Sequence, residues 1–282
     1  MKMMLPIKIN KAHRILYHYQ PYNKKYLEQT LRDLTIHLKQ PETFNDPWDC
    51  RPWYDLEGLN DDSVREAHIK YFTDPNLAHV FGNITATQLR SNPEKLLQMV
   101  RESTEHLWKL MNDKYRLYCF TPKEDNELMW SHYAKSHSGI CLRFNAESHP
   151  ISQACQLFYQ ETLPVLDLLD PYCLKNINTD TPSELLLTKS AVWSYEEEYR
   201  LLAYEITSDR TDEFKMAQLP FTINNFLKLP KGALTGIIIG CLSSNANEII
   251  KMVKKYQPQI TVQKANRNHH AYGLTFDVIY KA

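Results

Sequence analysis

The stretch that most constrains the fold of this 282-residue chain is KSAVWSYEEEYRLL, residues 189–202. Side chains of a β-strand alternate between the two faces of its sheet. On a strand, Glu196, Glu198 and Arg200 would therefore form one row, with aromatic and aliphatic residues on the opposite face. Two carboxylates and a guanidinium in a row, backed by apolar side chains, are more typical of a site than of an ordinary surface. We predict a strand here and a functional role for this row.

The three consecutive glutamates are also compatible with the solvated face of a helix. Arg200 favours the strand, because a strand would place it beside Glu198, where it can keep that carboxylate ionised through a charge-assisted hydrogen bond. We therefore expect Glu198 to be the key carboxylate, Glu196 to be the second, and Arg200 to orient them.

Composition excludes several function classes. The formal net charge is zero, which removes the broad basic footprint expected of a nucleic-acid-binding protein and leaves only the possibility of a local patch. None of the 7 glycines lies in a GxGxxG or GxxxxGK[ST] arrangement, so a Rossmann or P-loop nucleotide site is disfavoured.

The six cysteines contain no CxxC pair, which argues against a structural zinc site. The first residues lack the apolar core of a signal peptide, and no apolar run is long enough to span a membrane. We expect a cytoplasmic protein with reduced thiols and no membrane contact.

Hydrophobic periodicity predicts an α+β fold with a mixed, largely antiparallel sheet and flanking helices, in a single domain over residues 1–282. The polar stretch at about 61–112 has helical spacing and is predicted to be a helical insertion. Strands are expected at 14–19, 34–38, 115–121, 139–144, 156–160, 214–218, 235–240, 260–263 and 274–280, and helices at 23–33, 93–111, 127–137, 183–190 and 245–256.

Three further polar boxes accompany this row, and three of the four boxes sit at strand ends or in loops next to strands, where sites are often built. They are His18-Tyr19; Asn45-Asp46 with Asp49; and the WSHY box with Ser131 and Tyr133. Each has a structural alternative: a core histidine for His18, an Asx turn before Pro47, and core packing for the aromatic residues of WSHY.

These boxes resemble a known family. LYHY, FNDPWD, YCFTPKEDNELMWSHYAKSHSGICLRF and KSAVWSYEEEYRLL look like the signature of a bacterial family catalogued as domain of unknown function 2971. The resemblance covers roughly residues 14 to 240 and implies an intracellular bacterial protein.

The same boxes are similar to the ADP-ribosyltransferase superfamily, which places a His or Arg on its first strand, a Tyr or Ser in a middle box and a catalytic Glu on a later strand. Here His18, Ser131 with Tyr133, and Glu196 with Glu198 occupy the corresponding places. The resemblance implies NAD as a substrate, a macromolecular target, and nucleotide contacts from His18 and Tyr133.

We expect Tyr19, Asn45, Asp46 and Ser131 to contact the nucleotide as well. Two departures weaken this second resemblance: the middle box lies on a predicted helix, and no clear glycine–tyrosine strand follows it.

Two alternatives from other classes stay open. The carboxylates of Asp46, Asp49, Glu196 and Glu198 are hard ligands that suit Mg²⁺ in a metal-dependent phosphodiesterase or nuclease, although no PD-(D/E)xK spacing is present. A non-catalytic module, in which Arg200 and the aromatic residues bind a ligand or partner, is the third class.

Overall fold

The structure is a computed structural model that describes residues 9–51, 55–165, 169, 184–205 and 220–281. The chain divides into two compact units, each assembled from separate stretches. The first, which we call the sheet unit, consists of Met1–Lys39, Arg116–Tyr159 and Ala191–Ala282. The second, which we call the helical unit, consists of Gln40–Tyr115 and Gln160–Ser190. The single-domain organisation over residues 1–282 stays a prediction.

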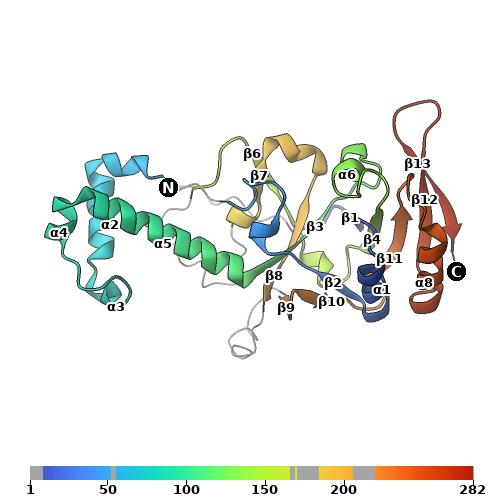
Figure 1. Ribbon diagram of the computed structural model, residues 1–282, viewed down its shortest axis with the longest axis horizontal. Helices are drawn as coiled ribbons and strands as arrows, with labels where there is room; N and C mark the ends of the chain where they lie inside the picture. Colours follow the sequence, from blue (N-terminus) through green and yellow to red (C-terminus); the bar gives the residue numbers. More distant parts are fainter. Residues whose placement is uncertain (1–8, 52–54, 166–168, 170–183, 206–219, 282) are drawn as a thin grey trace. The chain divides into compact units, whose positions relative to one another are not determined.

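The larger sheet of the sheet unit has five strands in the order β1-β4-β11-β12-β13 (Figure 1). Their bounds are β1 Ile15–Gln20, β4 Ile140–Asn145, β11 Leu234–Ile239, β12 Thr261–Arg267 and β13 Leu274–Tyr280. Neighbours are antiparallel except for β11 and β12, which are parallel. A parallel pair needs a crossover, and helix α8 (Ala246–Tyr256) provides it. The predicted α+β class with a largely antiparallel sheet is confirmed.

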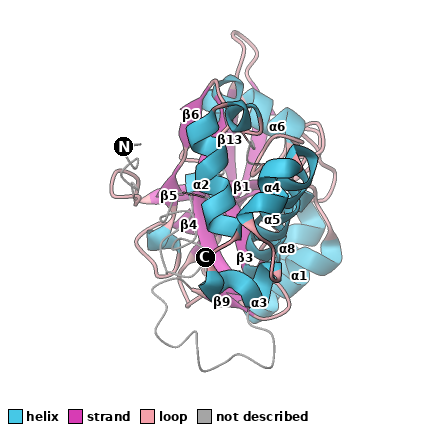
Figure 2. Cartoon of the chain, turned by 90° about the vertical axis from the view of Figure 1, so that its left-hand side faces the viewer, coloured by secondary structure: helices cyan, strands magenta, loops and turns pink. Residues whose placement is uncertain are grey.

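Helix α1 (Lys24–Asp33) lies beside α8 in both views (Figures 1 and 2). The side chain of Asn23 caps α1 by accepting a hydrogen bond from the Tyr26 amide, as the sequence predicts. The Gln257 side-chain amide, just beyond α8, donates to the carbonyl oxygen of Leu31 at 2.8 Å. Leu27 and Leu31 are fully buried in the main core, and each such burial contributes roughly 1.5–3 kcal/mol.

A second sheet in the sheet unit has the order β3-β8-β5, and β9 pairs with β8. Its strands are β3 Tyr115–Phe120, β5 Cys155–Gln156, β8 Tyr199–Glu205 and β9 Phe221–Thr222, while β2 Thr35–His37 pairs with β10 Phe226–Lys228. Two short strands, β6 Phe158–Gln160 and β7 Thr188–Ser190, complete the set in the described chain. The strand expected at 214–218 lies outside the described residues. Buried residues of β1, β3, β4 and β8 share one core, so the two sheets pack around the same apolar interior.

Four α-helices of the helical unit occupy most of the stretch predicted to be an insertion: α2 Asp62–Phe72, α3 Ala78–Phe81, α4 Ala86–Ser91 and α5 Pro93–Lys114. Local sequence sets where they begin. Asp61 caps α2, Thr85 and Gln88 form a capping box on α4, and Asn92 caps α5 directly before Pro93.

Short 3₁₀ helices are η1 Pro41–Thr43, η2 Glu57–Asn60, η3 Pro75–Leu77, η4 Ile151–Gln153, η5 Glu184–Leu186 and η6 Ala191–Glu196. Within the described ranges, no helix is both long and apolar enough to cross a membrane.

Helix α6 (Glu127–His132) ends five residues earlier than the predicted helix at 127–137. The next turn contains three consecutive left-handed residues, Lys135, Ser136 and His137, with φ between 47° and 65°. Left-handed backbone costs roughly 1–2 kcal/mol per non-glycine residue, so neighbouring contacts must hold it. The carbonyl of His137 accepts a hydrogen bond from the Leu242 amide, and the Gly139 carbonyl accepts one from the Gly240 amide.

This crossing of two backbone segments requires glycine at position 240. A Cβ atom there would lie 2.2 Å from the carbonyl oxygen of His137, so the backbone would have to move. We expect Gly240→Ala to lower the free energy of unfolding by about 3 kcal/mol. Gly232→Ala is the matched control, because its φ is +84° but nothing lies near its Cβ position, and it should cost about 1 kcal/mol. Urea unfolding of both variants measures the difference, and equal costs would contradict the close approach.

Candidate functional site

The stretch that opened the sequence analysis is only partly a strand. Strand β7 ends at Ser190, the 3₁₀ helix η6 covers Ala191–Glu196, and β8 begins at Tyr199. The predicted strand through residues 189–202 is therefore wrong in its middle. The helix predicted at 183–190 is also wrong, because the structure has the 3₁₀ helix η5 and the strand β7 there. The ladder with β5 begins only at Tyr199, opposite Gln156. Directly before it, Glu197 takes a left-handed conformation with φ 47°.

Burial nevertheless keeps the expected alternation. Glu196 and Glu198 are both 2% exposed and Arg200 is completely buried, whereas Glu197 points to solvent. Glu197 forms a surface ion pair with Lys123 at 2.6 Å. The backbone amide of Glu198 donates to the Tyr159 hydroxyl at 2.8 Å, which fixes the chain where it enters β8. The charged row is thus real, although a kinked segment rather than a continuous strand produces it.

Arg200 and Glu198 form a buried ion pair with two contacts. The guanidinium donates from Nε to Oε1 of Glu198 at 2.7 Å and from Nη2 to Oε2 at 3.4 Å. The side chains of Arg200 and Glu198 are 0% and 3% exposed. Burying either charge alone would cost several kcal/mol, so each group holds the other in place. This is the orienting role that the sequence predicts for Arg200.

Glu196 is bound from a different part of the chain. The hydroxyl of Tyr133, the C-cap residue of α6, donates to its Oε1 at 2.7 Å. Asn126 joins the same two segments. Its side-chain oxygen caps α6 by accepting hydrogen bonds from the amides of Leu128 and Met129. Its side-chain nitrogen donates to the carbonyl of Tyr195 at 2.9 Å. The WSHY box and the glutamate box therefore meet, as the sequence analysis anticipated for Tyr133.

His18 of β1 lies within electrostatic reach of this cluster. Burial lowers the pKa of His18 to about 4, and the positive charge of Lys39 adds to this effect. The hydrogen bond to the Cys119 carbonyl and the negative charge of Glu198 raise the pKa and so oppose the shift. The imidazole stacks on Tyr118 at 4.0 Å, and Nδ1 lies 2.7 Å from the Cys119 carbonyl oxygen. A carbonyl can only accept, so neutral His18 carries its proton on Nδ1 and keeps Nε2 as an acceptor.

Tyr19 points to the other face of β1. Its buried hydroxyl donates to the carbonyl of Lys123 at 2.8 Å, and the indole of Trp130 donates to the carbonyl of Glu124 at 2.8 Å. Burial, together with a hydrogen bond to Glu124, raises the pKa of Tyr17. These three aromatic residues hold the loop between β3 and α6, so the observed contacts of Tyr19 position the loop.

The remaining predicted residues are described by their own contacts. Ser131 is exposed on α6. Asn45 and Asp46 belong to the helical unit, where Asn45 is exposed and Asp46 accepts a hydrogen bond from the Trp48 amide at 3.0 Å. That contact is the Asx turn given above as the structural alternative. Within the same unit, buried Asp49 and Lys189 form an ion pair at 3.7 Å.

Two residues of the cluster escaped the sequence analysis. Tyr159 lies in a short strand pattern with nothing to mark its hydroxyl as a partner for a backbone amide 39 residues away. Asn126 directly precedes the helix predicted at 127–137, but its bond to Tyr195 depends on tertiary structure. Among the residues that the structure describes, no group of three His, Cys, Asp or Glu side chains is placed to hold a metal ion.

The sheet unit thus defines a class: an α+β protein with a buried carboxylate–guanidinium cluster. Residues 129–201 match the family model described as a protein of unknown function, DUF2971, and this segment contains Tyr133, Glu196, Glu198 and Arg200. The chain is thus similar to that family over residues 129–201, which confirms the first resemblance predicted from the sequence for this segment. Searches of curated proteins and of solved structures returned no match, so the similarity to ADP-ribosyltransferases has no support from them.

The ion pair in β8 is expected to dominate local stability. Arg200→Met leaves the Glu198 carboxylate buried without its guanidinium and should lower the free energy of unfolding by about 3–5 kcal/mol. Lys123→Met is the control, because it removes the partner of Glu197 in a half-exposed pair and should cost at most about 1 kcal/mol. Chemical denaturation of both variants makes the comparison, and a small, similar loss in each would mean that the buried pair is not needed.

The low pKa of His18 also predicts a pH dependence of stability. The unfolded chain binds a proton at His18 near pH 6.5, whereas the folded chain does so only near pH 4. Stability should therefore fall by about 3 kcal/mol as pH drops from 6.5 to 4, and it should be independent of His18 outside this window. His18→Phe keeps a ring on Tyr118 and removes the titration. The unfolding free energy of this variant should not show the fall of about 3 kcal/mol that His18 causes in the natural protein between pH 6.5 and 4. A difference between the two proteins that stays constant over this pH range would contradict the assignment.

Proposed function

We propose that the cluster of Glu196, Glu198, Arg200, Tyr133 and His18 is the site of an enzyme that binds NAD and transfers ADP-ribose to a macromolecule. The observation that supports this proposal is that side chains up to 182 positions apart in the sequence (18 to 200) belong to one cluster in the sheet unit. Tyr133 contacts Glu196 through a hydrogen bond, and His18 is coupled electrostatically to Glu198. The residue types are those that the superfamily resemblance implies for nicotinamide–ribose chemistry.

The chemistry of the cluster suits this substrate. NAD would supply a ribosyl group with nicotinamide as its leaving group, and breaking that bond leaves positive charge on the ribose. Glu198, held by Arg200, provides a fixed negative charge to stabilise such a centre. Neutral His18 offers Nε2 as an acceptor for a ribose hydroxyl, and Tyr133 provides a ring and a hydroxyl beside Glu196. Glu196 would take the proton from the attacking nucleophile.

A second function, a non-catalytic binding module, is favoured by one specific observation. Both carboxylates are 2% exposed and already bonded within the protein, as expected when a charged cluster organises a fold and ligands bind around it. In this case His132 and Trp193, whose rings contact each other at 6.1 Å near Tyr133, would present the binding surface. The metal-dependent alternative lacks a comparable observation in the described residues.

The experiment that separates the two functions measures NAD binding and nicotinamide release together. If the cluster is catalytic, NAD at ten times its Kd should stabilise the protein by about 1.4 kcal/mol without added metal, and nicotinamide should be released. Glu198→Gln should slow that release at least about 100-fold. Glu197→Gln, at the adjacent exposed position, is the control and should leave the rate within about twofold.

A folded Glu198→Gln variant with an unchanged release rate would refute the catalytic assignment. Tyr133→Phe checks the site independently, because it removes only the hydroxyl on Glu196 and should weaken protection by NAD. NAD binding without nicotinamide release supports the binding module. No thermal shift and no release with NAD would overturn the transferase proposal.

A further inference from the structure

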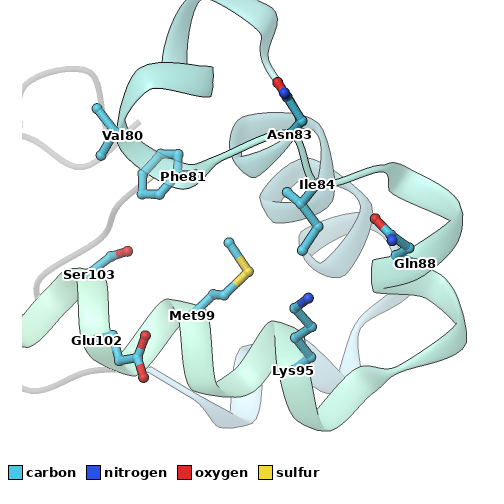
Figure 3. Close-up of a pocket in the computed structure, with 9 residues that line it drawn as sticks. All are labelled: Val80, Phe81, Asn83, Ile84, Gln88, Lys95, Met99, Glu102 and Ser103. Atoms are coloured by element: carbon cyan, nitrogen blue, oxygen red, sulfur yellow. The ribbon is translucent and has the colours of Figure 1, made fainter.

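The helical unit contains a cavity of about 460 Å³ that the sequence analysis did not anticipate (Figure 3). Helix α5 lines it with Lys95, Met99 and Glu102, and α3 with the turn after it adds Phe81 and Ile84. Sites for small molecules typically have volumes of 300–1,000 Å³, with a mainly apolar lining and a few polar groups. The size of this cavity therefore fits a small organic ligand, whereas its lining is more polar than is typical of such sites, with Lys95 and Glu102 among its residues.

The apolar part of the lining belongs to the core of the helical unit. Phe81, Ile84 and Met99 are half-buried and pack against its buried cluster. Figure 3 shows Ile84 and Met99 pointing toward each other across the cavity. A methionine side chain is flexible and polarizable, so it adapts to ligands of different outline. This region would receive the apolar body of a ligand.

A positive charge lies at one end of the cavity. Lys95 is in the first turn of α5, and its ammonium group points into the cavity in Figure 3. Lys95 is an exposed residue, and among the described residues its ammonium has neither an ion pair nor a hydrogen bond; its backbone amide donates to the side chain of Asn92. The N-terminal end of a 22-residue helix adds favourable potential for an anion. An anionic group is therefore the natural partner for Lys95.

A negative charge lies at the other end. Glu102 follows Lys95 by seven residues on α5, which corresponds to about 10 Å along the helix axis. Its carboxylate accepts a hydrogen bond from the Gln98 side chain at 2.7 Å and stays exposed at the rim. A ligand with a second anion at this end would be repelled.

We propose that this cavity binds a small amphipathic molecule with a single carboxylate head and an apolar body about 10 Å long. The carboxylate pairs with Lys95, and the apolar body lies against Phe81, Ile84 and Met99. Selectivity for one anionic group over two comes from Glu102. The residues of this site all belong to the helical unit, whereas those of the proposed transferase site belong to the sheet unit.

Calorimetric titration of the full chain with octanoate, octanedioate and octylamine tests the proposal. Octanoate should bind at least tenfold more tightly than the other two. Lys95→Met should weaken octanoate binding at least tenfold, and Lys95→Arg should retain it because the charge is kept. Lys109→Met removes an exposed lysine of the same helix outside the cavity and is the control, with no expected change.

Glu102→Gln should bring octanedioate within about threefold of octanoate. The proposal is overturned if octylamine binds as well as octanoate, if octanoate does not bind, or if Lys95→Met and Lys109→Met behave alike. Helix content of each variant, measured by circular dichroism, shows whether a loss reflects the charge; Lys95→Arg decides the matter if Lys95→Met loses helix.

Discussion

The buried ion pair between Arg200 and Glu198 is the interaction on which the rest of the sheet unit depends. A fully buried guanidinium is tolerated only with a partner that is equally withdrawn from water, and the two contacts to Glu198 supply one. That pairing requires the chain to turn sharply at Glu197 before entering β8, and Tyr159 stabilises the turn from another strand. A charge pair thus determines how a backbone segment enters its sheet.

The segment around α6 is positioned by polar contacts from both sides. Tyr19 and Trp130 hold the loop before it, and the left-handed turn after it is bonded to the chain that follows β11. Three left-handed residues in succession persist only because these neighbours leave no alternative path. The backbone hydrogen bonds from Leu242 to His137 and from Gly240 to Gly139 offset part of the cost in backbone energy. Strain of this kind commonly accompanies functional sites, which is consistent with the proposed role of the cluster.

Sequence patterns predicted most regular elements closely, because an alternating or helical period reflects the face that an element buries. The predicted strand at 274–280 coincides with β13, and the helix at 245–256 differs from α8 by one residue. The same reasoning failed in η6, where alternation of apolar and polar residues was compatible with a 3₁₀ helix as well as a strand. There, the contacts of Tyr133, Asn126 and Tyr159 decide the conformation, and local periodicity contains no information about them.

By itself, the sequence determined the α+β class, the positions of most elements, the family resemblance and the charged row of Glu196, Glu198 and Arg200. Only tertiary structure decided which boxes meet. It joined Tyr133 to Glu196, left Asp46 in an Asx turn within the other unit, and turned Tyr19 into a support for a loop. The physical reason is that burial patterns encode which face of an element is hidden, whereas partners 60 to 100 residues apart are selected by packing of the complete core.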